Sequence, residues 1–156
     1  MVREPLGTIL LIEDEASDAA LIRRGFEKVK VLNPIVHMSN GDTALEYLSG
    51  TGEYKDRVKH PLPVLILLDL KLPGMTGLQL LQWRRTQKHV RRIPVVVLTM
   101  NEDPATINDA YDLGANSYLV KPGDAAHIMK VVETIQQYWV KLNEPPQLVM
   151  KAGQSE

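Results

Sequence analysis

The sequence predicts an α/β protein built on a doubly wound, five-stranded parallel sheet. Four short segments are almost entirely apolar, a fifth is weaker, and patterns of helical periodicity separate them. Continuous apolar runs, rather than alternating ones, are typical of strands that helices cover on both faces. Regular alternation of strands and helices favours a parallel sheet with right-handed crossovers.

Each predicted strand is an apolar run, and helical periodicity marks the segments between them. The predicted strands are residues 8–12, 33–39, 63–70, 93–100 and 117–120, of which 33–39 is the weak one. The predicted helices are residues 17–30, 42–48, 77–87, 103–113 and 124 to about 142. Segments 49–63 and 143–156 contain glycine and proline, so we expect loops there.

Length and composition indicate one soluble domain. The 156 residues suit a domain at 1–142 followed by a short tail at 143–156. No apolar run approaches the roughly 20 residues that span a membrane, and the N-terminus lacks a secretory apolar region, so we expect a cytoplasmic protein. The absence of cysteine excludes disulfides and thiolate chemistry. A net charge of -1 argues against direct DNA binding.

Polar residues close the predicted strands. Glu13 and Asp14 follow the first strand, Asp69 ends the third, Thr99 ends the fourth, and Lys121 follows the fifth. In open α/β sheets, ligands bind beyond the carboxyl ends of the strands. We therefore expect these five side chains to meet at one edge of the sheet.

This set of residues favours phosphoryl chemistry. Carboxylates brought together repel one another unless a cation lies among them, and hard carboxylate oxygens suit Mg²⁺. With a metal ion bound, Asp69 could attack phosphorus and form an acyl phosphate. A lysine and a hydroxyl group, supplied by Lys121 and Thr99, would then bind the phosphoryl oxygens.

Four motifs, in order, resemble the receiver domain of two-component response regulators. They are "ILLIEDE", "LILLDLKLPGMTG", "PVVVLT" and "GANSYLVKP", and the resemblance covers roughly residues 8–142. It implies a flavodoxin-like (βα)5 fold with strand order 2-1-3-4-5. It also implies that Asp69 accepts phosphate from a sensor histidine kinase, and that the protein is a signalling phosphoacceptor rather than an enzyme.

The resemblance assigns a role to each site residue. It implies that Glu13, Asp14, Asp69 and the backbone carbonyl of Lys71 hold Mg²⁺.

For the phosphoryl group, the resemblance implies that Thr99 and Lys121 bind it, and that Tyr118 is an aromatic switch that turns inward when Thr99 moves. It further implies a cis peptide bond between Lys121 and Pro122. Packing in the core is the alternative for Tyr118, because half-buried tyrosines are common in strands.

A narrower resemblance, to the single-domain regulators that accompany bacterial phytochromes, rests on the long loop before Pro63, on "YDLGANSYLVKP" and on "IQQYWVKLNEPP". It implies a bacteriophytochrome as a candidate kinase partner. Few residues follow the last predicted helix, so we expect the signal to leave by protein contact.

The apolar stripe of the last predicted helix is longer than a small sheet needs. We expect a homodimer through this helix and the tail, with folding back onto the same domain as the alternative. The tail segment "QLVMK" could add a strand to such a contact, with disorder of the same residues as the equal alternative. The stripe consists of Ile128, Val131, Val132, Ile135, Tyr138, Trp139 and Leu142.

Three other functions are rivals of a phosphorylated receiver. A haloacid-dehalogenase-like phosphatase needs a second acid two residues after the nucleophile, where this chain has Lys71. A flavin-binding module needs a loop rich in hydroxyls and glycines after the first strand, where this chain reads "EDEASD". A receiver-like interaction module that works without phosphorylation remains the alternative.

Overall fold

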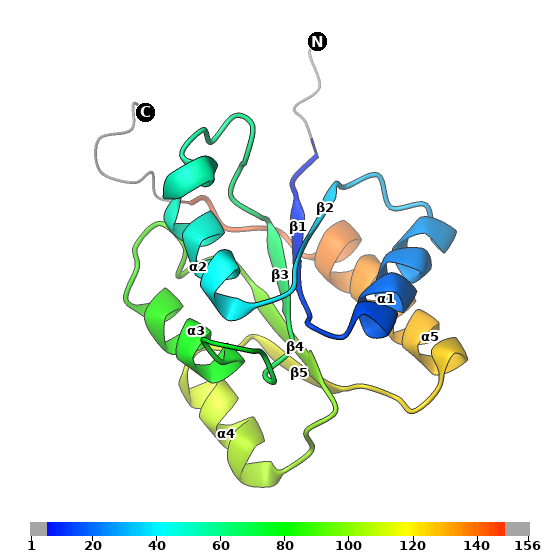
Figure 1. Cartoon of the computed structure of the whole chain (residues 1–156). Helices are drawn as coiled ribbons and strands as arrows, with labels where there is room; N and C mark the ends of the chain where they lie inside the picture. Colours follow the sequence, from blue (N-terminus) through cyan, green and yellow to red (C-terminus); the bar gives the residue numbers. More distant parts are fainter. Residues whose placement is uncertain (1–5, 149–156) are drawn as a thin grey trace.

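The computed structural model describes residues 6–148 and confirms the predicted fold. Five parallel strands form one sheet in the order β2-β1-β3-β4-β5 (Figure 1). The strands are β1 (Ile9–Ile12), β2 (Ile35–Met38), β3 (Leu65–Leu68), β4 (Val95–Thr99) and β5 (Ser117–Val120). The helices are α1 (Ala16–Lys28), α2 (Gly41–Ser49), α3 (Gly77–Arg85), α4 (Pro104–Asp112) and α5 (Ala125–Ile135).

The sheet lies between two layers of helices, with α1 and α5 on one face and α2, α3 and α4 on the other (Figure 1). Successive side chains along each strand point to opposite faces of the sheet and pack into two separate cores. In β1, Leu10 and Ile12 pack in the core beneath α2 and α3, whereas Ile9 and Leu11 pack in the core beneath α1 and α5. Both faces of the sheet are thus apolar, which explains the continuous runs in the sequence.

The start of α3 is set by its local sequence. Thr76 accepts a hydrogen bond from the Gln79 amide at 3.2 Å, and the Gln79 side chain accepts one from the Thr76 amide at 2.9 Å. This capping box satisfies amides that the first turn of a helix leaves unpaired. It therefore fixes where the chain after Asp69 becomes helical.

The long loop after α2 is tied to that helix. It contains a short 3-10 helix, η1 (Gly52–Tyr54). Arg57 donates hydrogen bonds to the carbonyl oxygens of Tyr47 and Leu48, at 2.7 and 2.8 Å. The Tyr47 hydroxyl donates to the carbonyl of Pro61 at 2.7 Å. Arg57 thus occupies carbonyl groups that the end of α2 leaves unpaired.

The last predicted helix differs from the prediction. The α-helix ends at Ile135 and continues as a π-helix, η2 (Gln136–Leu142), in which the Asn143 amide donates to the Tyr138 carbonyl at 2.7 Å. In this segment Trp139 packs against the core while Tyr138 is exposed. Among residues 6–148, no helix is long and apolar enough to cross a membrane.

The described part of the tail packs against its own domain. Residues Pro145, Pro146 and Leu148 line a small cavity at the edge of the sheet where β3 and β4 begin. Arg92 also donates to the Gln147 carbonyl at 3.5 Å. Most of the segment predicted to add a strand, residues 147–151, lies outside the described residues.

The predicted cis bond is wrong, because every peptide bond of the described residues, including Lys121–Pro122, is trans. Trans is the more stable form of an X-Pro bond by about 0.5–1 kcal/mol.

We expect Gly77→Ala to destabilise the protein. A Cβ at Gly77 would lie 2.6 Å from Leu70 Cα and 2.7 Å from the Asp69 carbonyl oxygen, both on the backbone. Overpacking of this kind lowers the free energy of unfolding by about 1–3 kcal/mol, more than the about 1 kcal/mol that alanine gains over glycine in a helix. Urea unfolding measures the net loss.

Gly123→Ala is the matched control. Because its Cβ would meet nothing, the free energy of unfolding should stay constant or rise by up to about 1 kcal/mol. Equal stability of the two alanine variants would contradict the close approach at Gly77.

Candidate functional site

The sheet positions the site residues through hydrogen bonds that run one residue beyond the strands. The amides of Glu13 and Asp69 donate to carbonyl groups at the ends of the neighbouring strands β2 and β1, each at 3.0 Å. The Lys121 amide donates to the carbonyl of Thr99 at 2.7 Å. All four residues are therefore fixed by backbone at the carboxyl edge of the sheet, as predicted.

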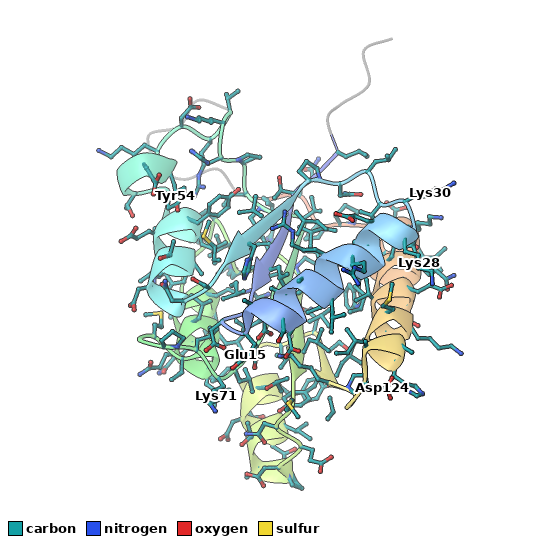
Figure 2. All side chains as sticks on the ribbon, turned by 45° about the vertical axis from the view of Figure 1, so that its right-hand side comes forward. Glu15, Lys28, Lys30, Tyr54, Lys71 and Asp124 are labelled. Carbon is teal, nitrogen blue, oxygen red and sulfur yellow. The ribbon has the colours of Figure 1, made fainter. Side chains whose placement is uncertain are left out.

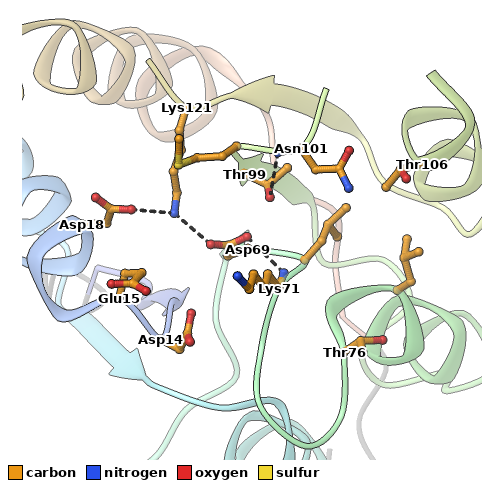
Figure 3. A pocket seen from close by; sticks show the side chains of 13 residues that line it. Asp14, Glu15, Asp18, Asp69, Lys71, Thr76, Thr99, Asn101, Thr106 and Lys121 are labelled. Atoms are coloured by element: carbon orange, nitrogen blue, oxygen red, sulfur yellow. Dashed lines mark hydrogen bonds and ion pairs between the residues drawn. The ribbon is translucent and has the colours of Figure 1, made fainter. Parts of the chain in front are cut away.

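A pocket of about 690 Å³ opens at this edge. Figure 3 shows its acidic side, where Asp14, Glu15 and Asp18 face Asp69. In Figure 2, Glu15 and Lys71 lie at the same end of the molecule, whereas Lys28 marks the far end of α1. The pocket thus lies where α1 and α3 begin.

Lys121 joins three carboxylates. Its ammonium nitrogen lies 2.7 Å from Glu13 Oε2, 2.8 Å from Asp69 Oδ2 and 2.9 Å from Asp18 Oδ2. The Lys121 and Glu13 side chains are only 3% and 1% exposed, while Asp18 is 23% exposed. Two nearly buried acids and one partly exposed acid thus share one buried cation.

Sequence reasoning missed Asp18. Its signal is an acid in the first turn of the helix that directly follows a strand, a position that also suits the helix dipole. Only the start of α1 at Ala16 shows that this turn lies over the pocket.

Burial and hydrogen bonding shift the pKa values of the three innermost groups. Burial raises the pKa of Glu13 to about 7, against the hydrogen bond from Lys121, which lowers it. Burial would also raise the pKa of Asp69, but hydrogen bonds from Lys121 and the Thr99 hydroxyl outweigh it, and the pKa is lowered. Burial would lower the pKa of Lys121, but its bonds to Asp69, Glu13 and Asp18 raise it. The ammonium therefore stays charged, and Asp69 is the more readily ionised of the two buried acids.

Three carboxylates are arranged as a metal site would require. Glu13, Asp14 and Asp69 each offer one oxygen atom within 4.8 Å of the others, and Asp14 is exposed. An all-carboxylate set carrying excess negative charge suits hard divalent cations such as Mg²⁺ and Mn²⁺. Lys71 lies beside this cluster, with its amide donating to Asp69 Oδ1 at 3.2 Å.

Thr99 is linked to Tyr118 through one loop residue. The Asn101 amide donates to Thr99 Oγ1 at 3.5 Å, and the Tyr118 hydroxyl donates to the Asn101 carbonyl at 2.6 Å. The Tyr118 ring is partly buried against the core, and burial, with the charge of Asp69, raises its pKa. Tyr118 is therefore both packed and hydrogen-bonded to the loop after β4.

A five-stranded sheet of this order, with acids, a hydroxyl and a lysine at its carboxyl edge, defines a receiver-type signalling domain. The chain belongs to the response regulator receiver domain family, whose model matches residues 9–133. This confirms the resemblance seen in the sequence.

Relatives extend this finding. The probable methanogenesis regulatory protein FilR2 of Methanothrix harundinacea is 37% identical over 141 residues, covering 88% of this chain and 86% of that protein. Response regulator Rcp1 of Synechocystis is 32% identical over 137 residues, covering 88% of this chain and 91% of that protein.

Solved structures agree. The Mn²⁺-bound form of Rcp1 is 31% identical with a TM-score of 0.84, covering 90% of this chain and 99% of that one. The phosphorylated cyanobacterial phytochrome response regulator RcpA is 32% identical with a TM-score of 0.86, covering 91% of this chain and 99% of that one. Both are similar to this chain over nearly its whole length.

We expect Glu13 to make the stability of the metal-free protein depend on pH. Because its pKa is raised from 4.5 to about 7, folded Glu13 holds a proton that unfolded Glu13 releases between these values. Its contribution to stability is thus present below pH 4.5 and is lost as the pH rises to 7.

The comparison is between wild type and Glu13→Gln, which cannot titrate. The difference in free energy of unfolding, wild type minus variant, should fall by about 1–3 kcal/mol between pH 4.5 and 7, measured by urea unfolding with EDTA. A difference that stays flat or rises would show that the pKa of Glu13 is not raised in the folded protein.

Proposed function

We propose that this protein is a single-domain response regulator of a two-component phosphorelay, with Asp69 as its phosphoacceptor. The observation that carries the proposal is the 2.8 Å contact between Lys121 and a buried, ionised Asp69 at the carboxyl edge of the sheet. A carboxylate kept ionised, with a cation beside it and a hydroxyl in reach, suits attack on phosphorus.

In the proposed transfer, one oxygen of Asp69 attacks the phosphorus of a phosphohistidine on a sensor kinase. A phosphorus–oxygen bond forms as the phosphorus–nitrogen bond breaks, and the imidazole leaves with the bonding electrons and takes up a proton. Lys121 and the Thr99 hydroxyl bind the transferred oxygens. Water later cleaves the acyl phosphate, so the protein assists its own transfer and hydrolysis without being an enzyme that acts on others.

We assign the metal to Glu13, Asp14, Asp69 and the carbonyl of Lys71. Mg²⁺ held there would neutralise the acids and so allow a phosphoryl group to enter the pocket. The geometry of the three carboxylates and the Mn²⁺-bound relative support this assignment.

We propose that the signal leaves through Tyr118. Movement of Thr99 toward a phosphoryl group would pull on Asn101, whose carbonyl accepts from the Tyr118 hydroxyl. A change there alters the surface formed by α4 and β5, which we propose contacts a protein target rather than DNA.

For the partner, we propose a cytoplasmic sensor histidine kinase, with a bacteriophytochrome as the first to test. RcpA, titled a phytochrome response regulator, supports that choice. FilR2, which is named for methanogenesis, has a sequence identity to this chain comparable to that of RcpA. Sensor kinases that respond to signals other than light therefore belong in the same test.

We expect Asp69→Asn to remove phosphorylation while leaving the fold intact, because the amide keeps the shape of the side chain but is not a nucleophile. Intact mass after incubation with Mg²⁺ and acetyl phosphate, and binding of beryllofluoride, measure this. Wild type should gain one phosphoryl group only when Mg²⁺ is present.

If the variant were still phosphorylated, the phosphoacceptor would be a residue other than Asp69. Failure of wild type with acetyl phosphate, beryllofluoride and every kinase tried would favour the interaction module that works without phosphorylation. Circular dichroism of both proteins checks that the variant keeps the fold.

We further propose a homodimer through the last helix and the tail. Tyr138 and Leu142 are 52% and 72% exposed on η2, which lies after the part that the family model matches. Exposed apolar side chains in one segment suit a contact between copies. The first part of the tail packs on its own domain, so the contact would rest mainly on η2.

Light scattering after size exclusion tests the dimer. Wild type should have the mass of two chains, and Leu142→Glu should halve that mass because a charge in an apolar contact is unfavourable. Leu32→Glu, at a residue 79% exposed after α1, is the control and should leave the mass unchanged. A monomeric wild type, with and without phosphorylation, would refute the dimer.

A further inference from the structure

We propose that Asp18 is a positioning residue for Lys121: it draws the ammonium toward α1 and so leaves Glu13 and Asp69 available to the metal. This inference rests on the proposed function, because it concerns metal binding at the same site. Of the three carboxylates within 2.9 Å of Lys121 Nζ, Asp18 is the one outside the described cluster of potential metal ligands.

The oxygens of the two buried acids are already engaged by donors of the protein. Glu13 Oε1 accepts from the Glu15 amide at 3.1 Å, and Oε2 contacts Lys121. Asp69 Oδ1 accepts from the Lys71 amide at 3.2 Å, and Oδ2 contacts Lys121. Asp69 also accepts from the Thr99 hydroxyl, which carries no charge. The amides are fixed by the backbone, whereas Lys121 has a long, charged side chain, so Lys121 is the cation that can withdraw.

Lys121 and a divalent cation compete for Glu13 and Asp69. Like charges repel, and the repulsion is stronger where the side chains are nearly buried, as those of Lys121, Glu13 and Asp69 are. The ammonium must therefore withdraw from at least part of these contacts when the carboxylates bind a metal.

Asp18 allows that withdrawal without leaving the ammonium unpaired. Figure 3 shows Lys121 Nζ between Asp18 of α1 and Asp69, with the two carboxylates on opposite sides. An ammonium has three protons to donate, and each of the three carboxylates takes one contact. Because an unpaired buried charge is unfavourable, Lys121 leaves Glu13 and Asp69 at a lower free-energy cost when Asp18 retains it.

The experiment is Mg²⁺ titration of the unphosphorylated protein by calorimetry. Asp18→Asn keeps the shape of the side chain and removes its charge, so Lys121 should stay on Glu13 and Asp69 and the Kd for Mg²⁺ should rise about tenfold, the usual effect of losing a group that orients metal ligands. The matched control is Glu15→Gln, which removes an exposed charge that lines the same pocket. Screening by salt should hold its effect to about twofold or less.

A second comparison places the effect on Lys121. In a Lys121→Met background, Asp18→Asn should leave the Kd for Mg²⁺ unchanged, because the competing ammonium is gone; such non-additivity is the sign of residues that act together. Equal weakening by Asp18→Asn with and without Lys121, or equal weakening by Glu15→Gln, would overturn the inference. So would an unchanged Kd in Asp18→Asn alone.

The two proposals fail in different ways. If wild type binds no Mg²⁺, the metal site of the proposed function is wrong. If wild type binds Mg²⁺ and Asp18→Asn binds it equally well, the site stands and only the role of Asp18 is refuted. Urea unfolding of each variant with EDTA confirms that it is folded, and Asp18→Ala serves as a second variant, since alanine suits a helix.

Discussion

The ammonium of Lys121 is the interaction on which the site depends. Glu13 and Asp69 lie side by side at the ends of adjacent strands, and both are buried. Without a cation between them, their repulsion would open the carboxyl edge of the sheet or force one of them to take up a proton. Lys121 reaches them from the end of β5, which lies three strands from β1 and two from β3 in the sheet, and so joins the two sides of the pocket.

This arrangement is possible because parallel strands end at the same edge. Neighbouring strands lie about 4.8 Å apart, so residues that follow their ends are brought within reach of one another. The ladder runs one residue past β1, β3 and β5, which holds the backbone of each charged residue by a hydrogen bond. The sheet thus fixes the positions of the charged residues, and the loops that follow do not have to hold them in place.

The strand order of the fold and most of the site residues could be predicted from the sequence. Apolar runs mark the buried strands, and the polar residue that closes each run marks the site. Asp69 and Lys121 follow from that rule. Asp18 does not, since its place over the pocket depends on where α1 begins and how it is rotated. The change from α-helix to π-helix after Ile135 depends on packing that a local pattern does not record, and the trans bond before Pro122 departs from what the resemblance implied.

The wide separation of the site residues along the chain has a consequence for folding and synthesis. Lys121 lies 103 residues from Asp18 and 52 from Asp69. Contacts between such distant positions form late, after the loops between them have closed. A chain emerging from the ribosome therefore carries its acids before their cation exists, and the carboxyl edge cannot assemble until β5 has been added. A ligand that needs this edge recognises only the finished sheet, and its binding free energy is added to the native state alone.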